Sequence, residues 1–112
     1  MIIIEHFNVI FLDEAEIFLA SLDIKVRNKI VFNIDKARTL LDPKLFKKLN
    51  DDIWEFRTTF QSNDYRLLAF WDKTDNQNTL VICTHGFIKK SQKTPKSEIH
   101  KALKIRLEYF KA

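Results

Sequence analysis

The residues best suited to chemistry lie in a lysine-rich segment near the end of the chain. A run rich in β-branched residues, 80–85, leads to Gly86, the only glycine in the sequence. The loop that follows carries four lysines and no acidic residue before Glu98; the lysines are Lys89, Lys90, Lys93 and Lys96. Ammonium groups held close together repel one another, so this placement favours a polyanionic ligand. A solvated basic connection is the structural alternative.

Side-chain alternation predicts a second group of useful residues on one face of a sheet. In the strand-like run 53–57, Trp54 and Phe56 point one way and the charged side chains the other, and the run 65–71 alternates in the same manner. If helices cover the Trp54 side, the opposite face stays open. The residues expected on that open face are Glu55, Arg57, Arg66 and Phe70, with His85 and Phe87 added in some strand registers. Two arginines and a carboxylate beside a lysine loop and an aromatic ring suit a phosphodiester and a stacked base.

Each of these residues also has an ordinary structural interpretation. The charged residues on the strands can form ion pairs on a solvated sheet face, a histidine on a strand is commonly a hydrogen-bonded structural residue, and most phenylalanines belong to the core. Cys83 and His85 are two residues apart on one expected face, but no second ligand pair accompanies them, so we expect no metal site. Glycine-rich phosphate loops and serine-nucleophile motifs are missing from the sequence, and we expect no cofactor.

Composition indicates what kind of protein carries these groups. The chain has 112 residues, of which 46% are hydrophobic and 30% charged, so we expect one globular domain over 1–112. The formal net charge of +4 favours an acidic partner, namely nucleic acid, an anionic membrane surface or an acidic protein. A single cysteine excludes an internal disulfide, and the apolar start is too short for a signal peptide. With no stretch of transmembrane length, we expect a cytoplasmic protein.

The first half of the chain reads as one strand and two helices. We expect an edge strand over 2–7, followed by a helix that Asp13 caps together with Glu16. Asp23 looks like the cap of a longer helix, whose apolar stripe runs at helical spacing until Asp42-Pro43 ends it.

The second half changes its apolar period from about 3.6 to 2. The runs 53–57, 65–71 and 80–87 read as antiparallel strands separated by polar turns at 61–64 and 72–78. Thr94-Pro95 reads as a helix cap followed by proline at the first helical position, which opens a closing helix over 96–110. The expected fold is an α+β domain in the order strand, helix, helix, three strands, helix, with the helices packed on one face of a small antiparallel sheet.

Several segments together resemble the phage-derived HigB-type branch of the RelE/ParE toxin superfamily, over about the last two thirds of the chain. The segments that carry the resemblance are Lys48-Leu49, 53–57 (Ile-Trp-Glu-Phe-Arg), 65–67 (Tyr-Arg-Leu) and 85–99, from His85 through the lysine loop to Ile99. The resemblance implies a RelE-like fold and a bacterial toxin that cleaves messenger RNA on the ribosome without metal. It also implies a helix-turn-helix antitoxin of the HigA kind as partner, contact with operator DNA only through that antitoxin, and no membrane association.

The resemblance also implies roles for individual residues. Arg57 and Arg66 would stabilise the phosphate, Lys89 and Lys90 would hold the RNA backbone with one of them transferring a proton, and Glu55 or His85 would act as base. Phe87 would stack on a base of the RNA. The remaining residues expected to bind RNA are Lys48, Gln92, Lys93 and Lys96.

Two other functions remain open from the sequence. ParE-type relatives with the same fold poison DNA gyrase by binding, without nuclease chemistry. A non-catalytic RNA-binding or ribosome-binding module would also use a basic face.

Overall fold

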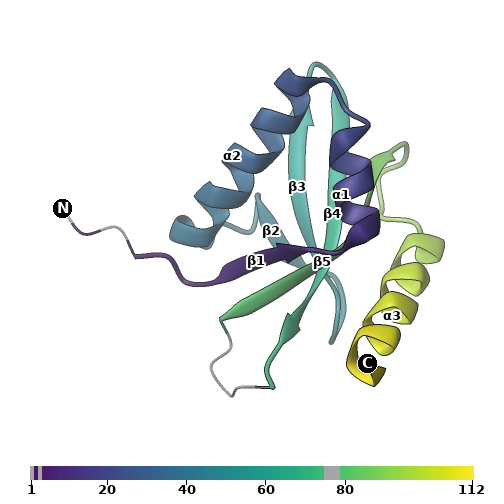
Figure 1. Cartoon of the computed structure of the whole chain (residues 1–112). Coiled ribbons are helices and arrows are strands. Elements are labelled where there is room, and N and C mark those ends of the chain that lie inside the picture. The colour runs from purple at the N-terminus through teal and green to yellow at the C-terminus, as the bar shows by residue number, and fades with distance from the viewer. Residues whose placement is uncertain (1, 3, 75–78) are drawn as a thin grey trace.

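The computed structural model describes residues 2, 4–74 and 79–112, and in these residues the chain forms five strands and three helices around one sheet (Figure 1). In chain order the elements are β1 (Asn8–Phe11), α1 (Asp13–Ala20), α2 (Ile24–Leu40), β2 (Phe46–Lys48), β3 (Trp54–Phe60), β4 (Asn63–Asp72), β5 (Leu80–Lys89) and α3 (Lys96–Lys111). The strand order across the sheet is β1-β5-β4-β3-β2. Among the strand pairs of the described residues only β1–β5 is parallel, so the predicted α+β class with a largely antiparallel sheet is confirmed. Within the described residues, no helix is long and apolar enough to cross a membrane.

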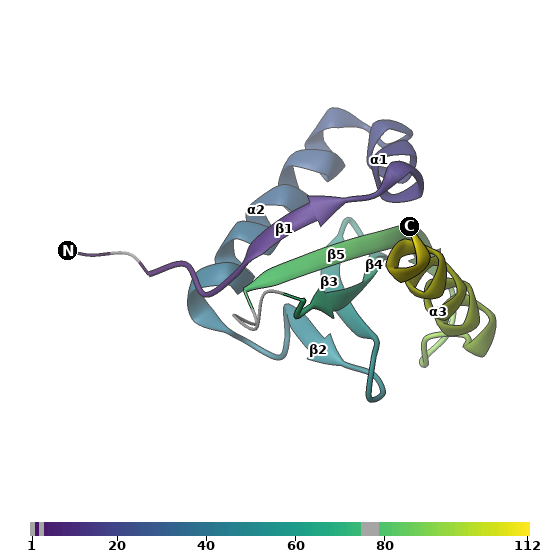
Figure 2. The same ribbon diagram turned by 60° about the horizontal axis from the view of Figure 1, so that its bottom comes forward.

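The helices cover both faces of the sheet, which corrects the expectation that all of them pack on one face. On one side α1 and α2 pack over a core that includes Phe56, Leu67 and Ala69. On the other side α3 packs over a second core around Leu68 and Phe70. Figure 2 shows α3 on the other side of β5 from α1 and α2. The reason is that the central strand β4 carries apolar side chains on both faces of the sheet, so helices must cover both faces.

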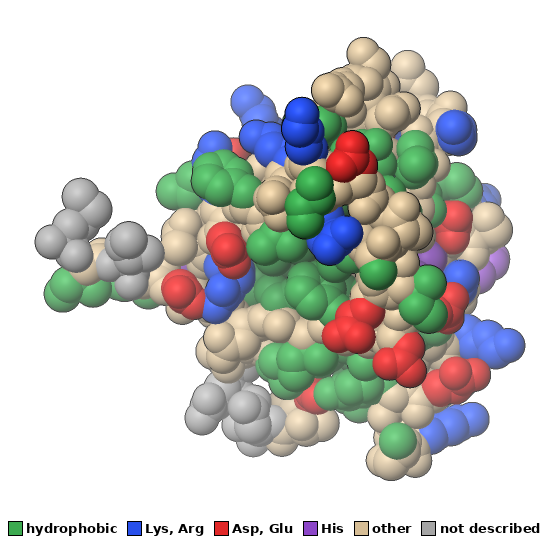
Figure 3. Space-filling view, turned by 45° about the horizontal axis from the view of Figure 1, so that its top comes forward, with side chains coloured by type: hydrophobic (Ala, Val, Ile, Leu, Met, Phe, Trp, Pro, Cys, Tyr) green, Lys and Arg blue, Asp and Glu red, His purple; other side chains and the backbone are tan. Residues whose placement is uncertain are grey.

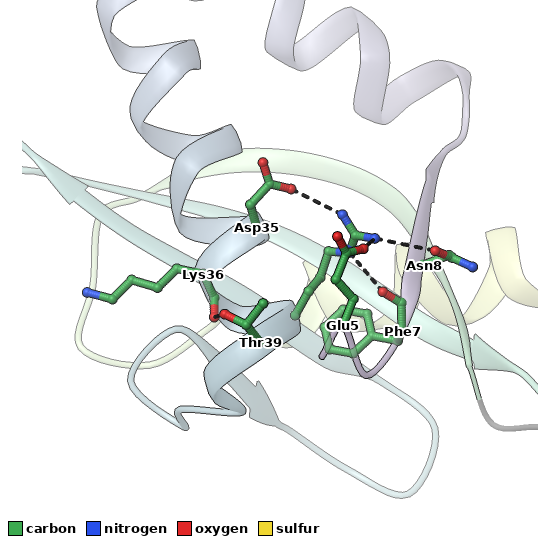
Figure 4. Close-up of polar contacts among 7 residues, drawn as sticks. Glu5, Phe7, Asn8, Asp35, Lys36 and Thr39 are labelled. Atoms are coloured by element: carbon green, nitrogen blue, oxygen red, sulfur yellow. Dashed lines mark hydrogen bonds and ion pairs between the residues drawn. The ribbon is translucent and has the colours of Figure 1, made fainter. Parts of the chain in front are cut away.

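The first strand lies later in the chain than expected. Residues 2 and 4–7 are not in a strand, residue 3 is outside the described residues, and the pairing begins at Asn8. Ile2 and Ile4 are 89% and 64% exposed, so these two side chains do not reach the core. Instead, the segment before β1 is fixed to α2 by Arg38, whose guanidinium donates to the carbonyl of Phe7 at 2.8 Å and is paired with Glu5 (Figure 4).

The predicted helix boundaries are right for α2 and partly wrong for α1. Asp23 caps α2, as expected, by accepting a hydrogen bond from the backbone N–H of Lys25. The helix ends before Asp42-Pro43, with Leu41 in a left-handed conformation (φ 52°) that turns the chain away. By contrast, Asp13 is the first residue of α1 and not its cap, so its carboxylate acts only as a negative charge in the first turn.

The strands of the second half are longer than predicted and include one that the sequence did not indicate. β3 and β4 extend to a two-residue turn, Gln61-Ser62, in which both residues have positive φ. The short strand β2 pairs with β3 at the sheet edge, and its three residues are too few to show a period. β5 continues through Gly86 to Lys89. Residues 75–78 of the expected turn between β4 and β5 lie outside the described residues.

The start of α3 differs from the expected Thr94 cap. Pro95 is the capping residue and Lys96 the first helical one, with no side-chain cap. The hydroxyl of Thr94 donates instead to the carboxylate of Glu55 on β3. Thr94 therefore ties the lysine loop to the sheet.

Gly86 is required because α1 lies directly on β5. A Cβ atom at this position would come within 2.1 Å of the Phe18 ring. We expect Gly86→Ala to lower the free energy of unfolding by about 1–3 kcal/mol, as overpacking does. The double variant Gly86→Ala/Phe18→Leu should recover part of that loss. Urea unfolding of the two variants measures both effects, and wild-type stability in Gly86→Ala alone would contradict the contact.

A hydrogen bond from Tyr109 to Asp72 fastens the last turn of α3 to the end of β4. The phenol donates to the carboxylate at 2.7 Å, which lowers the pKa of Asp72 below its ordinary 3.8 and raises the pKa of Tyr109 to about 12. The bond therefore stabilises the fold fully between about pH 4 and 10, and its contribution is lost as the pH falls through the lowered pKa of Asp72 or rises toward 12.

We expect Tyr109→Phe to cost about 1–2 kcal/mol at pH 7. The difference from the wild type should shrink as the pH drops below 3.8, the ordinary pKa of Asp72. Urea unfolding between about pH 3 and 9 measures it. A difference that does not change with pH would mean that packing, and not this hydrogen bond, causes the loss.

Candidate active site

Strand register on the α3 face brings the two predicted arginines and the glutamate together. Arg57 of β3 lies opposite Arg66 of β4, and Arg66 lies opposite Phe87 of β5. Glu55 is two residues before Arg57 on the same strand, so both side chains lie on one face. The expected grouping of these residues on a single sheet face is confirmed.

Glu55 is the centre of this group. Its side chain is 2% exposed, and one carboxylate oxygen lies 3.5 Å from Nε of Arg57 and 3.3 Å from Nε of Arg66. The other oxygen accepts the hydrogen bond of Thr94. A buried carboxylate is tolerated only when opposite charges and hydrogen bonds compensate it, and here two guanidinium groups and a hydroxyl do so.

The two arginines differ in how far they reach solvent. Arg66 is 4% exposed and donates to the carbonyl of Tyr65 at 3.1 Å, whereas the side chain of Arg57 is 31% exposed. Burial lowers the pKa of Arg66, against the opposing effect of Glu55. Among the described residues, the Nε–H groups of both arginines are buried without a hydrogen-bond partner. Each Nε–H instead faces the Glu55 carboxylate as an ion pair, at 3.5 Å for Arg57 and 3.3 Å for Arg66.

Lys89 extends the cationic group along β5. It lies opposite Asp64, whose carboxylate accepts a hydrogen bond from Thr59 at 2.7 Å. The pKa of Lys89 is lowered, first by desolvation and then by the neighbouring positive charge of Arg66. The pKa of Asp64 is also lowered, chiefly by its hydrogen bond from Thr59. Lys89 is thus a lysine that gives up its proton more readily than an isolated one.

An open cleft of about 250 Å³ lies over these groups, between the sheet and the lysine loop. Its lining residues are Lys47, Leu49, Glu55, Arg57, Lys89, Gln92, Lys93, Thr94 and Ile99. Arg57 also lines a second hollow of about 360 Å³, together with Arg66, Lys44 and Asn33. Arg57 therefore lies between two cationic depressions, the second of which Arg66 also lines, and an anionic chain can lie across them.

The family described as phage derived protein Gp49-like (DUF891) matches residues 17–107, which is 91 of the 112 residues (107 − 17 + 1). The chain belongs to this Gp49-like family. The matched range includes every residue of the cleft and omits β1. No curated protein matches the sequence.

In this Gp49-like chain His85 lies apart from the cleft. It is opposite Leu68, which separates it from Glu55 on the next strand. Its ring is 2% exposed, with Nε2 at 3.1 Å from Glu98 and Nδ1 at 2.9 Å from Thr84. Burial lowers the pKa of His85, while the hydrogen bond to Glu98 acts in the opposite direction. The geometry is that of a hydrogen-bonded histidine that holds the first turn of α3 on the sheet.

A β-bulge at Thr84 changes the faces that alternation had assigned on β5. Leu68 pairs with His85 and Ala69 with Cys83, so Thr84 is the extra residue. Cys83 consequently belongs to the core under α1 and α2, while His85 faces α3. The expectation that Cys83 and His85 share a face is therefore wrong. In the part of the chain that the structure describes, no three His, Cys, Asp or Glu side chains form a group able to hold a metal ion.

The other predicted residues divide between the cleft and its surroundings. Gln92 and Lys93 line the cleft, whereas Lys90 and Lys96 are exposed beside it. Phe87 is half-buried against the α3 core, with its ring centroid 6.1 Å from that of His85. Phe70 is fully buried beneath Tyr109 and is a core residue.

Two polar cleft residues, Lys47 and Thr94, were not predicted as site residues, and neither were the apolar Leu49 and Ile99. Lys47 pairs with Glu55 and Lys48 with Trp54, so the two lysines of β2 lie on opposite faces of the sheet. Lys47 lines the cleft, and Lys48 lines a different pocket. Deciding from the sequence which of the two lysines lines the cleft would have required the register of β2 against β3. A three-residue strand is too short to indicate that register.

Proposed function

We propose that this protein is the toxin of a type II toxin–antitoxin pair, of the HigB kind, and that it cleaves messenger RNA on the ribosome without a metal. Membership of the Gp49-like family, whose members resemble HigB-type toxins, supports the toxin role. The observation that carries the nuclease proposal is the buried carboxylate of Glu55, which holds two arginines beside an open, lysine-lined cleft.

The reaction is a transesterification within the RNA. The 2′-oxygen forms a bond to the adjacent phosphorus as its proton passes to a solvent water molecule, and the bond from phosphorus to the 5′-oxygen breaks as that oxygen takes a proton from Lys89. The products are a 2′,3′-cyclic phosphate and a 5′-hydroxyl, and neither an oxidant nor water is consumed. The protein must align the nucleotide, neutralise the additional phosphate charge and move protons.

The groups of the cleft can meet these needs. Arg57, which is partly exposed, contacts the phosphate, and Arg66 adds positive charge from beneath it. Lys89 transfers a proton to the departing 5′-oxygen, because its lowered pKa makes it a better acid than an ordinary lysine. Lys47, Gln92 and Lys93 hold the RNA backbone on either side.

Glu55 and His85 take positioning roles in this proposal and not the role of base. The carboxylate of Glu55 is occupied by two ion pairs and the Thr94 hydroxyl, and it is almost fully buried. His85 is held by Glu98 and lies outside the cleft lining. Phe87 lies opposite Arg66 on the neighbouring strand, and its partly exposed ring could stack on a base.

The proposed partner is a helix-turn-helix antitoxin of the HigA kind, which alone would contact operator DNA. The chain has a formal net charge of +4, and its surface carries exposed apolar side chains among charged ones, as Figure 3 shows. An antitoxin segment that combines acidic and apolar residues would cover such a surface well. Its target, the translating ribosome, would place the toxin in the cytoplasm.

Induced expression in a bacterial host tests this function. We expect growth and protein synthesis to stop, messenger RNA to be cut, and DNA supercoiling to stay normal, with rescue by the gene product encoded next to the toxin. DNA breaks that depend on gyrase, with messenger RNA intact, would indicate a ParE-like poison. Arrest of translation without new RNA ends would indicate a non-catalytic ribosome-binding module.

A further inference from the structure

A pocket larger than the arginine cleft lies apart from it. It measures about 470 Å³ and lies where the turn between β2 and β3, the end of β4 and the last turns of α3 meet. Its walls are fixed by specific contacts: Arg106 of α3 pairs with Asp52 of the turn at 3.5 Å and covers the ring of Phe110 at 5.2 Å. Asn50 holds the turn itself through hydrogen bonds to two backbone N–H groups. The pocket is thus built by three separate elements.

Aromatic side chains form one wall. Trp54 and Trp71, the only two tryptophans of the chain, both line the pocket and are half-buried. Their rings meet edge to face with centroids 6.0 Å apart, and Trp54 stacks on Phe46 at 4.8 Å. The tryptophans are therefore held rigidly. Rigid, partly exposed indole rings are good platforms for a flat aromatic ligand.

The charged residues of the wall include three without an ion-pair partner among the described residues. Lys48 lies opposite Trp54 on the neighbouring strand, and Lys73 follows the end of β4. Both ammonium groups can bind a phosphate. Asp51 supplies a carboxylate that can accept hydrogen bonds from an exocyclic amino group of a base.

We propose that this pocket binds a nucleotide, with the base against Trp54 or Trp71, its amino group toward Asp51 and its phosphate on Lys48 and Lys73. The wall can bind a flat aromatic ring, a hydrogen-bond donor and an anion, and a nucleotide carries all three. The nucleotide is either free or one unit of a single-stranded RNA. Only the binding of single-stranded RNA rests on the proposed ribonuclease function. The pocket would then be a subsite that holds the strand away from the point of cleavage.

The two tryptophans make the test direct, because both lie in the pocket and no others contribute to the fluorescence. The purified chain is titrated with GMP and with a short single-stranded oligoribonucleotide while tryptophan emission is recorded. We expect a saturable change with GMP. In Lys48→Ala/Lys73→Ala, GMP should bind about tenfold more weakly. The matched control is Lys25→Ala/Lys36→Ala, which removes the same charge from the exposed side of α2 and should bind GMP as the wild type does.

The oligoribonucleotide distinguishes the two sources. RNA is the ligand if the oligoribonucleotide binds more tightly than GMP and if each lysine removed makes the slope of log K against log salt concentration shallower by about 0.7. Binding no tighter than GMP identifies a free nucleotide. No saturable change with either probe, or equal losses in the Lys48/Lys73 and Lys25/Lys36 variants, would overturn the proposal. Failure of the chain to cleave messenger RNA would leave the GMP result untouched, so the two proposals fail separately.

Discussion

Replacing Arg57 with alanine is expected to lower the rate of messenger RNA cleavage by about 10²- to 10³-fold, the loss typical of removing one preorganised donor from a site of developing negative charge. Arg57 is the better test residue of the two arginines because its side chain is 31% exposed, so its removal should leave the fold intact. Arg57→Lys should restore only part of the activity, since an ammonium keeps the charge but loses the planar fork of donors. The measurement is the rate at which purified protein cuts messenger RNA on translating ribosomes.

Arg66 needs a different substitution. It is 4% exposed and paired with a buried carboxylate, so alanine at this position would destabilise the protein as well as remove a charge. Arg66→Lys is the informative variant, with Arg27→Ala as a control that removes an arginine of α2 that does not line the cleft. Cleavage at the wild-type rate by folded Arg57→Ala and Arg66→Lys would show that the arginine pair is not the site.

Glu55→Ala is expected to lower the free energy of unfolding by about 3–5 kcal/mol, because it leaves the buried charge of Arg66 with only the more distant Asp64, at 4.0 Å, as a partner and Thr94 without its acceptor. Glu55→Gln keeps an oxygen for Thr94 but removes the negative charge, so it should be less destabilising and still strongly impaired in cleavage. Arg57 and Arg66 would no longer be held in place. Urea unfolding and cleavage rates measure the two effects.

The pH dependence of cleavage separates this positioning role from that of a base. If Glu55 only positions the arginines, Glu55→Gln lowers the rate at every pH and leaves the shape of the pH–rate profile unchanged. If Glu55 is the base, the acid limb of the profile disappears in the variant. The double variant Glu55→Gln/Arg66→Met supplies a further check: replacing both members of the pair should recover stability but not cleavage.

The elements that position the cleft could largely be predicted from the sequence, because each has a strong local signal. The period-2 runs of β3 and β4 gave the shared face of Glu55, Arg57 and Arg66, and the cap at Asp23 gave the start of α2. The prediction that this face of the sheet is open was only partly correct. Phe70 lies under α3, because apolar residues on both faces of β4 require cover on both sides.

What the sequence could not show depends on contacts between distant segments. The bulge at Thr84 reverses the faces of β5, and a bulge has no signature in a single run of alternating residues. Lys47 and Lys48 are adjacent lysines whose assignment to opposite faces depends on the register of β2 against β3. Thr94 resembles a helix cap locally, and only the tertiary contact with Glu55 reveals its role as a tie between loop and sheet.

The most direct test of the proposed activity is the chemistry of the RNA ends. Translating ribosomes carrying a defined messenger RNA are incubated with the purified protein and with its Arg57→Ala variant, and the ends of the fragments are determined. Attack by the 2′-hydroxyl predicts a 2′,3′-cyclic phosphate and a 5′-hydroxyl with the wild-type protein, and intact messenger RNA with Arg57→Ala over the same time. Fragments that end in a 3′-hydroxyl and a 5′-phosphate, or messenger RNA left whole by the wild-type protein, would contradict the proposed mechanism.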